Sequence, residues 1–474
     1  MNILFVNPNY NGMEYISQGI AYLSSRVKKD GHNTALLDFT FSRSLLDDKL
    51  IKQAIDFSPD IICISSTSSL FNSSLKIAAH LKKMIQVPVL LGGPQTTVAP
   101  ENSISKDCID IICIGEGEES LAAYANNPER TDIPGLWFKQ GNAIIRNAAA
   151  PLFTNLDALP MPDFEIFDLD KYIRSRNFII DIITSRGCPY SCTYCINQTY
   201  GKIYGPKWHK IRKNSVHYII SFIKSLKHKY PIIKTFDFKD DCFATDVAWL
   251  KEFSEVYPKE VGLPYIIHMR PELASEERCK LLNDSGCIAV KMGIESGSET
   301  IRKKILNRHM SNKDIINAFN NVKKAGMNTF SFNMIALPHE KPRDILKTLT
   351  LNRQIQPGLF SCNIFQPFEG TSIRTQCIND GLLEPTQETQ NNIHTKSILK
   401  QKQLPQIIIR FFYIFSGLIV FFPKQPIKSF LWVIRTSTEF LHPILRKLLP
   451  KNIKSYLWKL LIYSSQLKSN KKSL

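Results

Sequence analysis

Strand and helix patterns alternate in two long stretches of this chain, and no other feature of the sequence constrains its fold as strongly. In residues 1–145, apolar runs of strand length alternate with helical patterns around residues 15–29, 46–57 and 71–85. The runs are Ile3–Val6, Ala35–Leu37, Ile61–Ile64, Val87–Leu91 and Ile111–Ile114. This alternation predicts a parallel sheet with helices on both faces, a doubly wound, Rossmann-like α/β domain. The ligand of such a domain binds beyond the carboxyl ends of the strands.

Small and turn-forming residues follow four of these predicted strands. They form the runs 7–12, 65–67, 92–94 and 115–118. Glycine lets a ligand approach the backbone closely, and hydroxyl or amide groups can bind its polar rim. One such run alone is more often an ordinary turn, but four runs at strand ends favour a ligand site. The residues expected to line it are Asn9, Gly12, Ser65, Gly92, Gly93 and Glu116.

A second alternating stretch predicts an incomplete barrel over residues 178–385. Its helical patterns include Glu272–Asn283, Asn312–Lys324 and Arg343–Leu351. Its strand-like runs are Phe178–Thr184, Ile232–Phe238, Tyr265–Met269, Ile288–Met292, Thr329–Ile335 and Phe360–Phe365. Six such units make a partial (β/α)6 barrel of the TIM type, whose reactive loops gather at the carboxyl ends of the strands. Residues 146–177 are then a linker, and residues 386–474 form a separate C-terminal region.

Three cysteines occupy the loop after the first predicted barrel strand, in the spacing C-x3-C-x2-C. Cys188, Cys192 and Cys195 can bind three irons of a 4Fe-4S cluster, which leaves the fourth iron without a protein ligand. A structural zinc site would need a fourth ligand, and His209 is the nearby candidate. A disulfide framework is not expected, since the eleven cysteines are an odd number and several lie in apolar runs. We therefore expect a reducing compartment and a cluster site.

Further polar residues recur at the predicted carboxyl edge of the barrel. Asp240 and Asp241 follow the second strand, Arg270 ends the third, the run 293–297 follows the fourth, and Asn333 lies in the fifth. Carboxylates, a guanidinium and hydroxyls together suit a ligand with an ammonium group, a carboxylate and a ribose. The alternative is structural, with the two aspartates capping a helix and Arg270 paired with Glu272.

These motifs resemble those of a known family. The cysteine loop, with the aromatic Tyr194 before its last cysteine, resembles the signature of radical S-adenosylmethionine enzymes. Residues 1–385 resemble the cobalamin-binding subgroup of that family. Besides the N-terminal domain, the segments that carry this resemblance are the linker 156–163 and the runs 240–243, 293–298 and 367–371. The resemblance implies a 4Fe-4S cluster, S-adenosylmethionine and cobalamin as cofactors. The barrel residues that it implies at the cofactors are Tyr194, Asp240, Asp241, Arg270, Gly293, Glu295 and Ser296.

The resemblance also implies a mechanism. The free iron would chelate S-adenosylmethionine, and one electron from a donor such as flavodoxin or ferredoxin would release a 5′-deoxyadenosyl radical. In methylating members, methylcobalamin gives its methyl group to the substrate radical. We expect methylation of an unactivated carbon in an apolar or natural-product substrate. Radical oxidation, cyclisation or rearrangement, as in the anaerobic magnesium-protoporphyrin cyclase, and a non-catalytic iron–sulfur or zinc scaffold at a membrane are the alternatives.

Three positions depart from the pattern of this family. Asn9 stands where a histidine ligand of cobalt occurs in D-x-H-x-x-G, which predicts cobalamin without an axial histidine. The run 336–340 replaces glycine–x–proline–glycine–glutamate, and Glu369 stands where proline is common. The last two positions make the turn after the fifth barrel strand the least predictable part of the barrel.

The C-terminal region is basic and apolar. Residues 401–474 carry thirteen lysines and arginines against one acid, and contribute +12 of the net charge of +18. The uncharged stretch 411–422 is shorter than the roughly 20 residues that span a bilayer. Beyond Pro423, apolar residues recur at helical spacing among lysines, with Trp432 and Trp458. This pattern predicts amphipathic helices on an anionic membrane surface, or helices that close the open side of the barrel.

Two further expectations concern the location of the protein and its partners. The N-terminus begins with a strand pattern and lacks the features of a secretory signal, so we expect a cytoplasmic protein, peripheral on the inner face of the membrane if the tail binds lipid. The basic residues accompany a large apolar face, so no nucleic-acid partner is expected.

Overall fold

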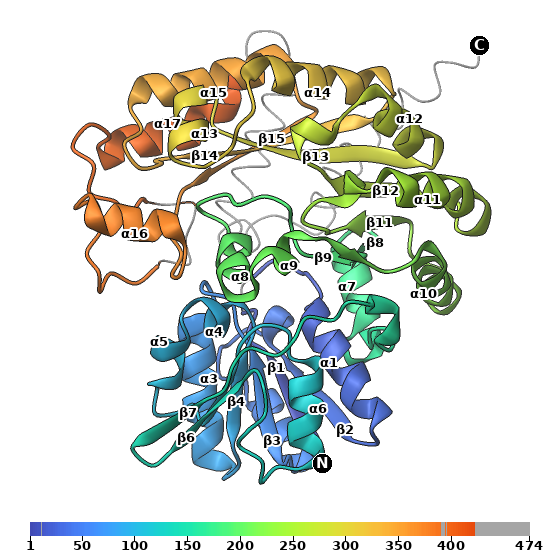
Figure 1. Ribbon diagram of the computed structural model, residues 1–474, viewed down its shortest axis with the longest axis vertical. Coiled ribbons are helices and arrows are strands. Elements are labelled where there is room, and N and C mark those ends of the chain that lie inside the picture. The colour runs from blue at the N-terminus through green and yellow to red at the C-terminus, as the bar shows by residue number, and fades with distance from the viewer. Residues whose placement is uncertain (11, 390–393, 395, 422–474) are drawn as a thin grey trace.

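A computed structural model describes residues 1–10, 12–389, 394 and 396–421 of the chain. Two α/β units are stacked, with the short helices α8 (Ile196–Tyr204) and α9 (Pro206–His209) between them (Figure 1). The predicted order of a doubly wound domain followed by a partial barrel is confirmed. The predicted amphipathic helices after Pro423 lie outside the described residues.

The N-terminal unit holds a seven-stranded sheet in the order β2-β1-β3-β4-β5-β6-β7. Five parallel strands are followed by an antiparallel hairpin, β6–β7, that the sequence pattern did not predict. The strands are β1 (Asn2–Asn7), β2 (Asn33–Asp38), β3 (Ile61–Ser65), β4 (Val89–Gly92), β5 (Ile111–Cys113), β6 (Leu136–Gln140) and β7 (Ala143–Arg146). The helices are α1 (Gln18–Lys29), α2 (Asp48–Phe57), α3 (Phe71–Met84), α4 (Pro94–Val98), α5 (Pro100–Ile104) and α6 (Glu118–Asn126).

Burial on both faces explains the continuous apolar strands of this sheet. Ile3 and Phe5 of β1 pack in one hydrophobic core, while Leu4 and Val6 pack in a second core on the opposite face. Strands that are covered by helices on both faces have no solvent side, so they do not alternate with polar residues.

The second unit is an open, six-stranded parallel sheet in the order β15-β14-β13-β12-β11-β8. Its strands are β8 (Ile179–Ile182), β11 (Thr235–Phe238), β12 (Tyr265–His268), β13 (Cys287–Glu295), β14 (Asn328–Ile335) and β15 (Leu359–Ile364). A two-residue ladder joins β9 (Ser185–Arg186) to β10 (Arg212–Lys213). The helices are α7 (Leu169–Ser175), α10 (Val216–Lys229), α11 (Val247–Glu260), α12 (Glu276–Asp284), α13 (Glu299–Lys304), α14 (Asn312–Lys324), α15 (Pro342–Ile355), α16 (Ser372–Asn379) and α17 (Gln406–Phe421).

Alternation along the barrel strands separates an outer from an inner face. Phe236, Phe238 and Tyr265 belong to the buried core shared with the outer helices. The intervening residues, among them Asp237 and Lys291, point to the inner face. Helices α14, α15 and α17 cover the outer side, so the inner face of the sheet is turned toward the N-terminal unit (Figure 1).

Helix α17 packs on the outside of the barrel rather than across its open side. Ile409, Phe412 and Val420 form a buried core with residues of α15 and β15. Within the described residues, no helix is both long enough and apolar enough to cross a membrane. The prediction that the stretch from residue 411 does not span a bilayer agrees with this length.

The turn after β14 keeps an unusual backbone without glycine. Ala336 and His339 adopt φ values of +63° and +61°, a left-handed conformation that glycine favours. The buried Glu340 closes the turn by accepting a hydrogen bond from the backbone N–H of Leu337 at 3.1 Å. The second departure, Glu369, accepts hydrogen bonds from Gln95 and Asn102, both at 3.1 Å, and so connects the barrel to the N-terminal unit.

Glu340 predicts a dependence of stability on pH. Burial raises the pKa of its carboxyl group to about 8. Because the folded protein binds this proton more tightly than the unfolded chain, the resulting stability is fully present below about pH 4.5 and is lost as the pH rises through about 8. When the pH rises from 6 to 8.5, the unfolding free energy of the parent should fall because of Glu340. The fall should be about 2–3 kcal/mol smaller in the Glu340→Gln variant, which has no carboxyl group there. Urea denaturation at each pH measures the unfolding free energy. The same change with pH in the two proteins would contradict the raised pKa of Glu340.

Candidate active site

The cysteine loop is anchored to the barrel at its start. Asp240, fully buried after β11, accepts hydrogen bonds from the backbone N–H of Thr184 at 3.2 Å and from its hydroxyl at 2.9 Å. The hydroxyl of Ser185 also donates to it. Burial raises the pKa of Asp240, and nearby Lys213 opposes this. Asp240, predicted to contact a cofactor, is therefore occupied in fixing the loop, and it does not cap a helix.

The three cysteines lie on this loop below the inner face of the barrel. Cys188 and Cys192 are buried and Cys195 is partly exposed. Burial raises the pKa of Cys188 to about 12 and that of Cys195 to about 11, so both thiols are protonated until a metal displaces their protons. All eleven cysteines lie within the described residues as free thiols, as expected for a chain without a disulfide framework.

Polar donors surround the sulfur atoms. The Arg270 guanidinium donates to Cys192 Sγ at 3.2 Å, and the Asn197 side-chain amide donates to Cys195 Sγ at 3.5 Å. Asn197 also donates to Asp241 at 2.9 Å. Asp241, which was predicted from the sequence, therefore lies beside Cys195. A thiol-rich loop with a nearby cation fits an iron–sulfur cluster, whose thiolates and sulfides carry negative charge.

His209 does not complete a zinc site in this geometry. Its Nδ1 donates to the carbonyl of Cys188 at 3.0 Å, and its ring packs against Gly201. Among the described residues, no three or more His, Cys, Asp or Glu side chains are arranged to hold a single metal ion. Each cysteine of a 4Fe-4S cluster binds a different iron, so the cluster does not require such convergence.

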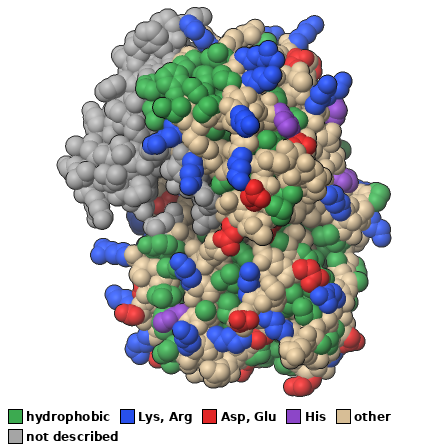
Figure 2. All heavy atoms as spheres, turned by 90° about the vertical axis from the view of Figure 1, so that its left-hand side faces the viewer, with side chains coloured by type: hydrophobic (Ala, Val, Ile, Leu, Met, Phe, Trp, Pro, Cys, Tyr) green, Lys and Arg blue, Asp and Glu red, His purple; other side chains and the backbone are tan. Residues whose placement is uncertain are grey.

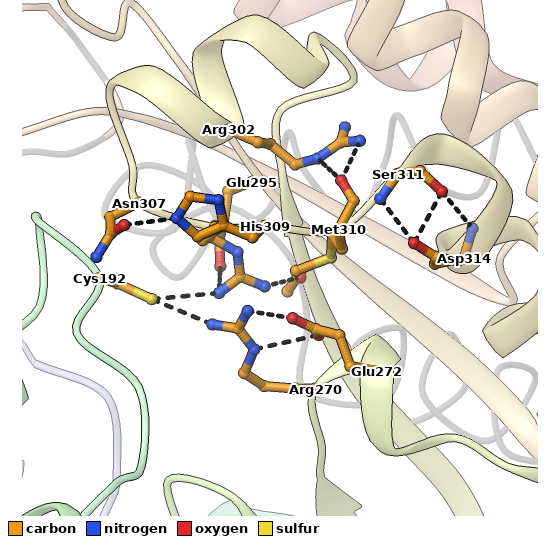
Figure 3. A network of polar contacts seen from close by, with 12 residues as sticks. Cys192, Arg270, Glu272, Glu295, Arg302, Asn307, His309, Met310, Ser311 and Asp314 are labelled. Atoms are coloured by element: carbon orange, nitrogen blue, oxygen red, sulfur yellow. Dashed lines mark hydrogen bonds and ion pairs between the residues drawn. The ribbon is translucent and has the colours of Figure 1, made fainter.

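A charged network adjoins Cys192 on the barrel side (Figure 3). Tyr194 donates to Glu295 Oε1 at 3.2 Å, and Arg308 lies 3.9 Å from the same oxygen. Arg308 also donates to Tyr194 at 3.1 Å and to the carbonyl of Gly293 at 2.5 Å. Burial raises the pKa of Glu295, and the Arg308 charge counteracts this. Tyr194, Gly293 and Glu295, all predicted from the sequence, therefore lie together.

Local backbone geometry aims Glu295 into this network. The register between β13 and β14 shifts between Gly293 and Glu295, and Glu295 itself has a φ of +67°. A bulge at the end of a strand re-aims a side chain, and a non-glycine residue with positive φ is uncommon and is held there by its surroundings. Arg308, which the sequence analysis missed, supplies the neutralising charge from the segment after α13.

Arg270 makes the predicted pair with Glu272, and its contact with a ligand stays a prediction. It pairs with Glu272, and its guanidinium also stacks over the Tyr190 ring at 3.8 Å while reaching Cys192. Paired in this way, Arg270 holds a fixed orientation beside the cysteine loop.

Ser296 and Asn333 point away from the site. Ser296 is fully buried and contacts Thr348 of α15, and its hydroxyl accepts from the backbone of Ser298. Asn333 hydrogen-bonds to Ser331, Asn352 and the carbonyl of Ser361 on the outer side of the sheet. Both side chains are therefore engaged on the side of the sheet that α15 covers, and their contact with a cofactor stays a prediction.

Gly297 shows why the run 293–297 ends in glycine. A Cβ at this position would lie 2.3 Å from the carbonyl oxygen of Lys347 and 2.6 Å from the Cα of Thr348. Both are backbone atoms of α15, so they cannot swing aside. The glycine therefore permits close packing of α15 against the end of β13.

This packing gives a pair of opposite stability predictions. Gly297→Ala should lower the unfolding free energy by about 2 kcal/mol, because α15 must move away from the sheet. Gly19→Ala is the matched control, since a Cβ at Gly19 of α1 meets nothing within 4 Å. It should raise stability by about 0.5–1 kcal/mol through helix propensity. Thermal unfolding of both variants tests the pair, and an unchanged midpoint for Gly297→Ala would contradict the close approach.

The carboxyl edge of the N-terminal sheet holds the other predicted residues. Asn9 donates from its amide to the Met13 carbonyl at 2.8 Å and to Thr40 Oγ1 at 3.1 Å. Gly12 lies against Asn9, and a Cβ at Gly93, with a φ of +94°, would lie 2.8 Å from the carbonyl oxygen of Ser66. Ser65 and Gly92 end β3 and β4 at the same edge.

Glu116 makes ion pairs with two arginines of the barrel unit. Its carboxylate pairs with Arg212 at 2.9 Å and with Arg186 at 3.4 Å, and it accepts from the backbone of Phe153. Arg186 immediately precedes the cysteine loop, so Glu116 connects that loop to the N-terminal unit.

An aromatic stack lies between the two units and was not predicted. The rings of Tyr200 and Trp208 are 4.3 Å apart and nearly parallel, and Tyr204 extends the stack. Tyr204 lies directly against Gly115, which has a φ of +81°. A Cβ at Gly115 would lie only 1.7 Å from the Tyr204 hydroxyl oxygen, so the contact requires glycine. Helices α8 and α9 therefore join the cysteine loop to the carboxyl edge of the N-terminal sheet.

Two family models match the chain. The model of the radical SAM superfamily matches residues 182–351, and that of the B12 binding domain matches residues 11–125. An uncharacterized methyltransferase of Pyrococcus horikoshii is 28% identical over 374 residues, which cover 77% of this chain and 79% of that protein. The cytidylyl-2-hydroxyethylphosphonate methyltransferase of Streptomyces wedmorensis is 22% identical, covering 80% and 81%. The anaerobic magnesium-protoporphyrin IX monomethyl ester cyclase of Cereibacter sphaeroides is 23% identical, covering 79% and 63%.

Solved structures share the fold. The radical S-adenosylmethionine methyltransferase TsrM of Kitasatospora setae, with cobalamin and a 4Fe-4S cluster bound, has a TM-score of 0.68 at 18% identity over 79% of this chain and 78% of that one. OxsB, a cobalamin-dependent S-adenosylmethionine radical enzyme with aqua-cobalamin bound, has a TM-score of 0.71 at 16% identity, covering 100% and 81%.

The fold and the cysteine loop define a radical S-adenosylmethionine enzyme with a B12-binding domain. The chain is similar over 77% and 80% of its length to the two proteins above that are named as methyltransferases. Its cofactors are a 4Fe-4S cluster, S-adenosylmethionine and cobalamin, in agreement with the sequence-based expectation.

Proposed function

We propose that this enzyme methylates an unactivated carbon of a small, largely apolar substrate. The observation that carries the proposal is that the cysteine loop, the Glu295–Arg308 network and the edge of the B12-binding sheet lie on the same side of the barrel. Two relatives match this chain over about four fifths of their own length, and both are named as methyltransferases. The bound cofactors supply a radical and a methyl group, and the chain orients them and excludes water.

Each protein group has a defined part in the proposed site. Cys188, Cys192 and Cys195 hold the cluster, while Arg270 and Asn197 donate to its sulfur ligands. Glu295, held by Tyr194 and Arg308, faces the cluster from β13 and can accept a hydrogen bond from an ammonium group or a ribose. Asn9, which stands in place of a histidine, donates its amide to the Met13 carbonyl and to Thr40, and we propose that cobalamin binds here without an axial histidine.

Product analysis of anaerobic turnover tests methyl transfer. Reconstituted protein receives S-adenosylmethionine labelled at the methyl group, a reduced flavodoxin as electron donor, and metabolite extract as the source of substrate. S-adenosylhomocysteine formed together with 5′-deoxyadenosine, with label in a new product, supports the proposal. 5′-deoxyadenosine without S-adenosylhomocysteine would contradict it.

That second outcome would support radical oxidation, cyclisation or rearrangement without methyl transfer. The similarity to the anaerobic magnesium-protoporphyrin IX monomethyl ester cyclase favours this alternative, although the chain covers only 63% of that protein. The same cluster and cofactors serve both reactions, so the residues described above do not distinguish them.

We also propose that the enzyme works in the cytoplasm at the inner face of a membrane. Helix α17 exposes the side chains of Ile407, Phe411, Ile414 and Phe415 along one face. Figure 2 shows a continuous hydrophobic patch on the upper part of the side where this helix lies. The basic residues 422–474 follow directly in the sequence. Apolar side chains beside many lysines suit an anionic lipid surface.

Liposome flotation tests this placement. A chain ending at residue 421 keeps α17 but removes eleven basic residues, and it should float with phosphatidylglycerol vesicles much less than the full chain. Phe411→Ser with Phe415→Ser should weaken flotation of the full chain in the same assay. Equal flotation of all three proteins would overturn the membrane proposal.

A further inference from the structure

Six charged or titratable side chains form a network on the inner face of the barrel, deeper than the Glu295 site. The strand register pairs Asp181 with Asp237 and His268 with Lys291, while the other two members follow α7 and β11 directly. We call this set the inner-wall network, and its members are Arg176, Asp181, Asp237, Lys239, His268 and Lys291. None of them belongs to the family motifs or to the cysteine loop.

The contacts in this network centre on the two carboxylates. Asp237 lies 2.6 Å from the ammonium groups of both Lys239 and Lys291, and 3.9 Å from His268 Nε2. Asp181 pairs with Arg176 and lies 3.7 Å from Lys239. Three basic side chains, those of Arg176, Lys239 and Lys291, therefore face two carboxylates.

The surplus positive charge points into the barrel. The side chains of Asp181 and Asp237 are only 3% and 2% exposed, whereas those of Lys239, Lys291 and His268 are 20%, 12% and 30% exposed. Burial and the neighbouring Lys239 help to lower the pKa of Lys291 to about 8. Burial and Lys291 lower the pKa of His268 to about 3, so this ring is neutral. Asp237 Oδ1 and His268 Nε2 make no hydrogen bond within the described residues.

An aromatic wall adjoins the inner-wall network on β14. The Phe332 ring stacks on His268 with a centroid distance of 6.0 Å, and Phe330 lies 5.8 Å below the Lys291 ammonium group. Both rings are partly exposed. Gly293 lies two residues beyond Lys291 on the same face of β13, about 7 Å along the strand, and the register shift after Gly293 turns the next charged residue, Glu295, toward Tyr194 and Arg308.

The N-terminal unit closes the other side of the network. The Tyr15 ring lies 4.4 Å from the Arg176 guanidinium and 4.7 Å from the Lys239 ammonium group. Gln18 donates to the backbone carbonyl of Asp181 at 3.0 Å. Tyr15 follows the loop that contains Asn9 and Gly12, so the network lies where the edge of the B12-binding domain meets the barrel.

We propose that the inner-wall network binds an anionic group of the substrate, a carboxylate or a phosphate, while the apolar body of the substrate lies against Phe330 and Phe332. One bound anion would balance the surplus charge and accept charge-assisted hydrogen bonds from Lys291 and Lys239. The substrate would then extend from Lys291 toward Glu295, with its reacting carbon at the cofactor end. This inference rests on the proposed function only in taking the barrel as the substrate site.

A purely structural ion-pair network is the competing explanation, and ligand binding separates the two. Isothermal titration calorimetry of the full, reconstituted protein uses octyl phosphate, octanoate, octanol and octyltrimethylammonium as probes. We expect one or both anions to bind about tenfold or more tightly than the other two. Comparing octyl phosphate with octanoate identifies the preferred anion. Equal binding of all four probes would overturn the proposal.

Matched variants locate the anion site. Lys291→Met should weaken binding of the preferred anion about tenfold or more, whereas Lys280→Met, at an exposed lysine of α12, should leave it unchanged. Asp237→Asn adds one unit of surplus positive charge and should bind the anion at least as tightly as the parent. Unchanged affinity in Lys291→Met, or weaker affinity in a folded Asp237→Asn variant, would overturn the assignment.

Failure of this inference is distinguishable from failure of the proposed function. Cys192→Ala should retain binding of the anionic probe while losing S-adenosylmethionine cleavage. A protein that cleaves S-adenosylmethionine but shows no preference for anions would refute only the inner-wall site.

Discussion

Replacing Cys188, Cys192 or Cys195 with alanine should reduce reductive cleavage of S-adenosylmethionine to the background of protein without cluster. Three thiolates are the only protein ligands expected for the cluster, and their loop has no fourth cysteine that could substitute. Loss of one ligand leaves an iron open to solvent and makes the cluster unstable. Iron and sulfide content, the absorption of the cluster near 400 nm and the yield of 5′-deoxyadenosine measure the effect.

Cys279→Ala is the matched control for this experiment. Cys279 is a fully buried thiol on α12, on the outer side of the barrel, and it contacts none of the three motif cysteines in the hydrogen-bond network described. The control should keep its iron and its activity, at a small cost in stability. Cobalamin bound to the N-terminal unit should be retained in all four variants. Cleavage at the parent rate by any motif variant would refute the cluster assignment.

The sequence predicts the fold well because strand burial leaves a direct trace in it. Runs such as Ile3–Val6 are apolar at every position because helices cover both faces of the sheet. The hairpin β6–β7 left a weaker trace, since it is short, lies at the edge of the sheet and contains Lys139 and Arg146. Such an edge pair is stabilised by its neighbour β5 more than by its own pattern.

The site was predictable where a motif fixes residue types, and less so where strand alternation decides. Tyr194 of the cysteine loop and Glu295 of β13 lie together, and both were singled out by their motifs. Ser296 follows Glu295 directly and so faces α15, a consequence of alternation that the motif alone does not reveal. Arg308 lies in a segment without a motif, thirteen residues after Glu295, and only the fold brings its charge to that carboxylate. A buried carboxylate without a local partner was the available signal that a distant cation must exist.

After the cysteine variants, Arg308→Met should have the largest effect, on both the stability of the protein and its binding of S-adenosylmethionine. The side chain of Arg308 is nearly fully buried and contacts Glu295, Tyr194 and the carbonyl of Gly293. Methionine keeps the bulk but leaves Glu295 without its counter-charge, which we expect to cost about 3–5 kcal/mol of unfolding free energy. The pKa of Glu295, already raised by burial, should rise further, so the carboxylate that is proposed to meet the cofactor becomes protonated.

A double-mutant cycle separates this charge effect from a loss of packing. Glu295→Gln removes the charge that Arg308 neutralises, so adding it to Arg308→Met should recover most of the lost stability while S-adenosylmethionine binding stays weak. Urea denaturation and equilibrium dialysis of S-adenosylmethionine measure the two quantities. Arg353→Met, at an exposed position of α15, is the control and should change neither. Additive destabilisation in the double variant would show that Arg308 acts through its packing, and unchanged cofactor affinity in all variants would remove Glu295 from the proposed site.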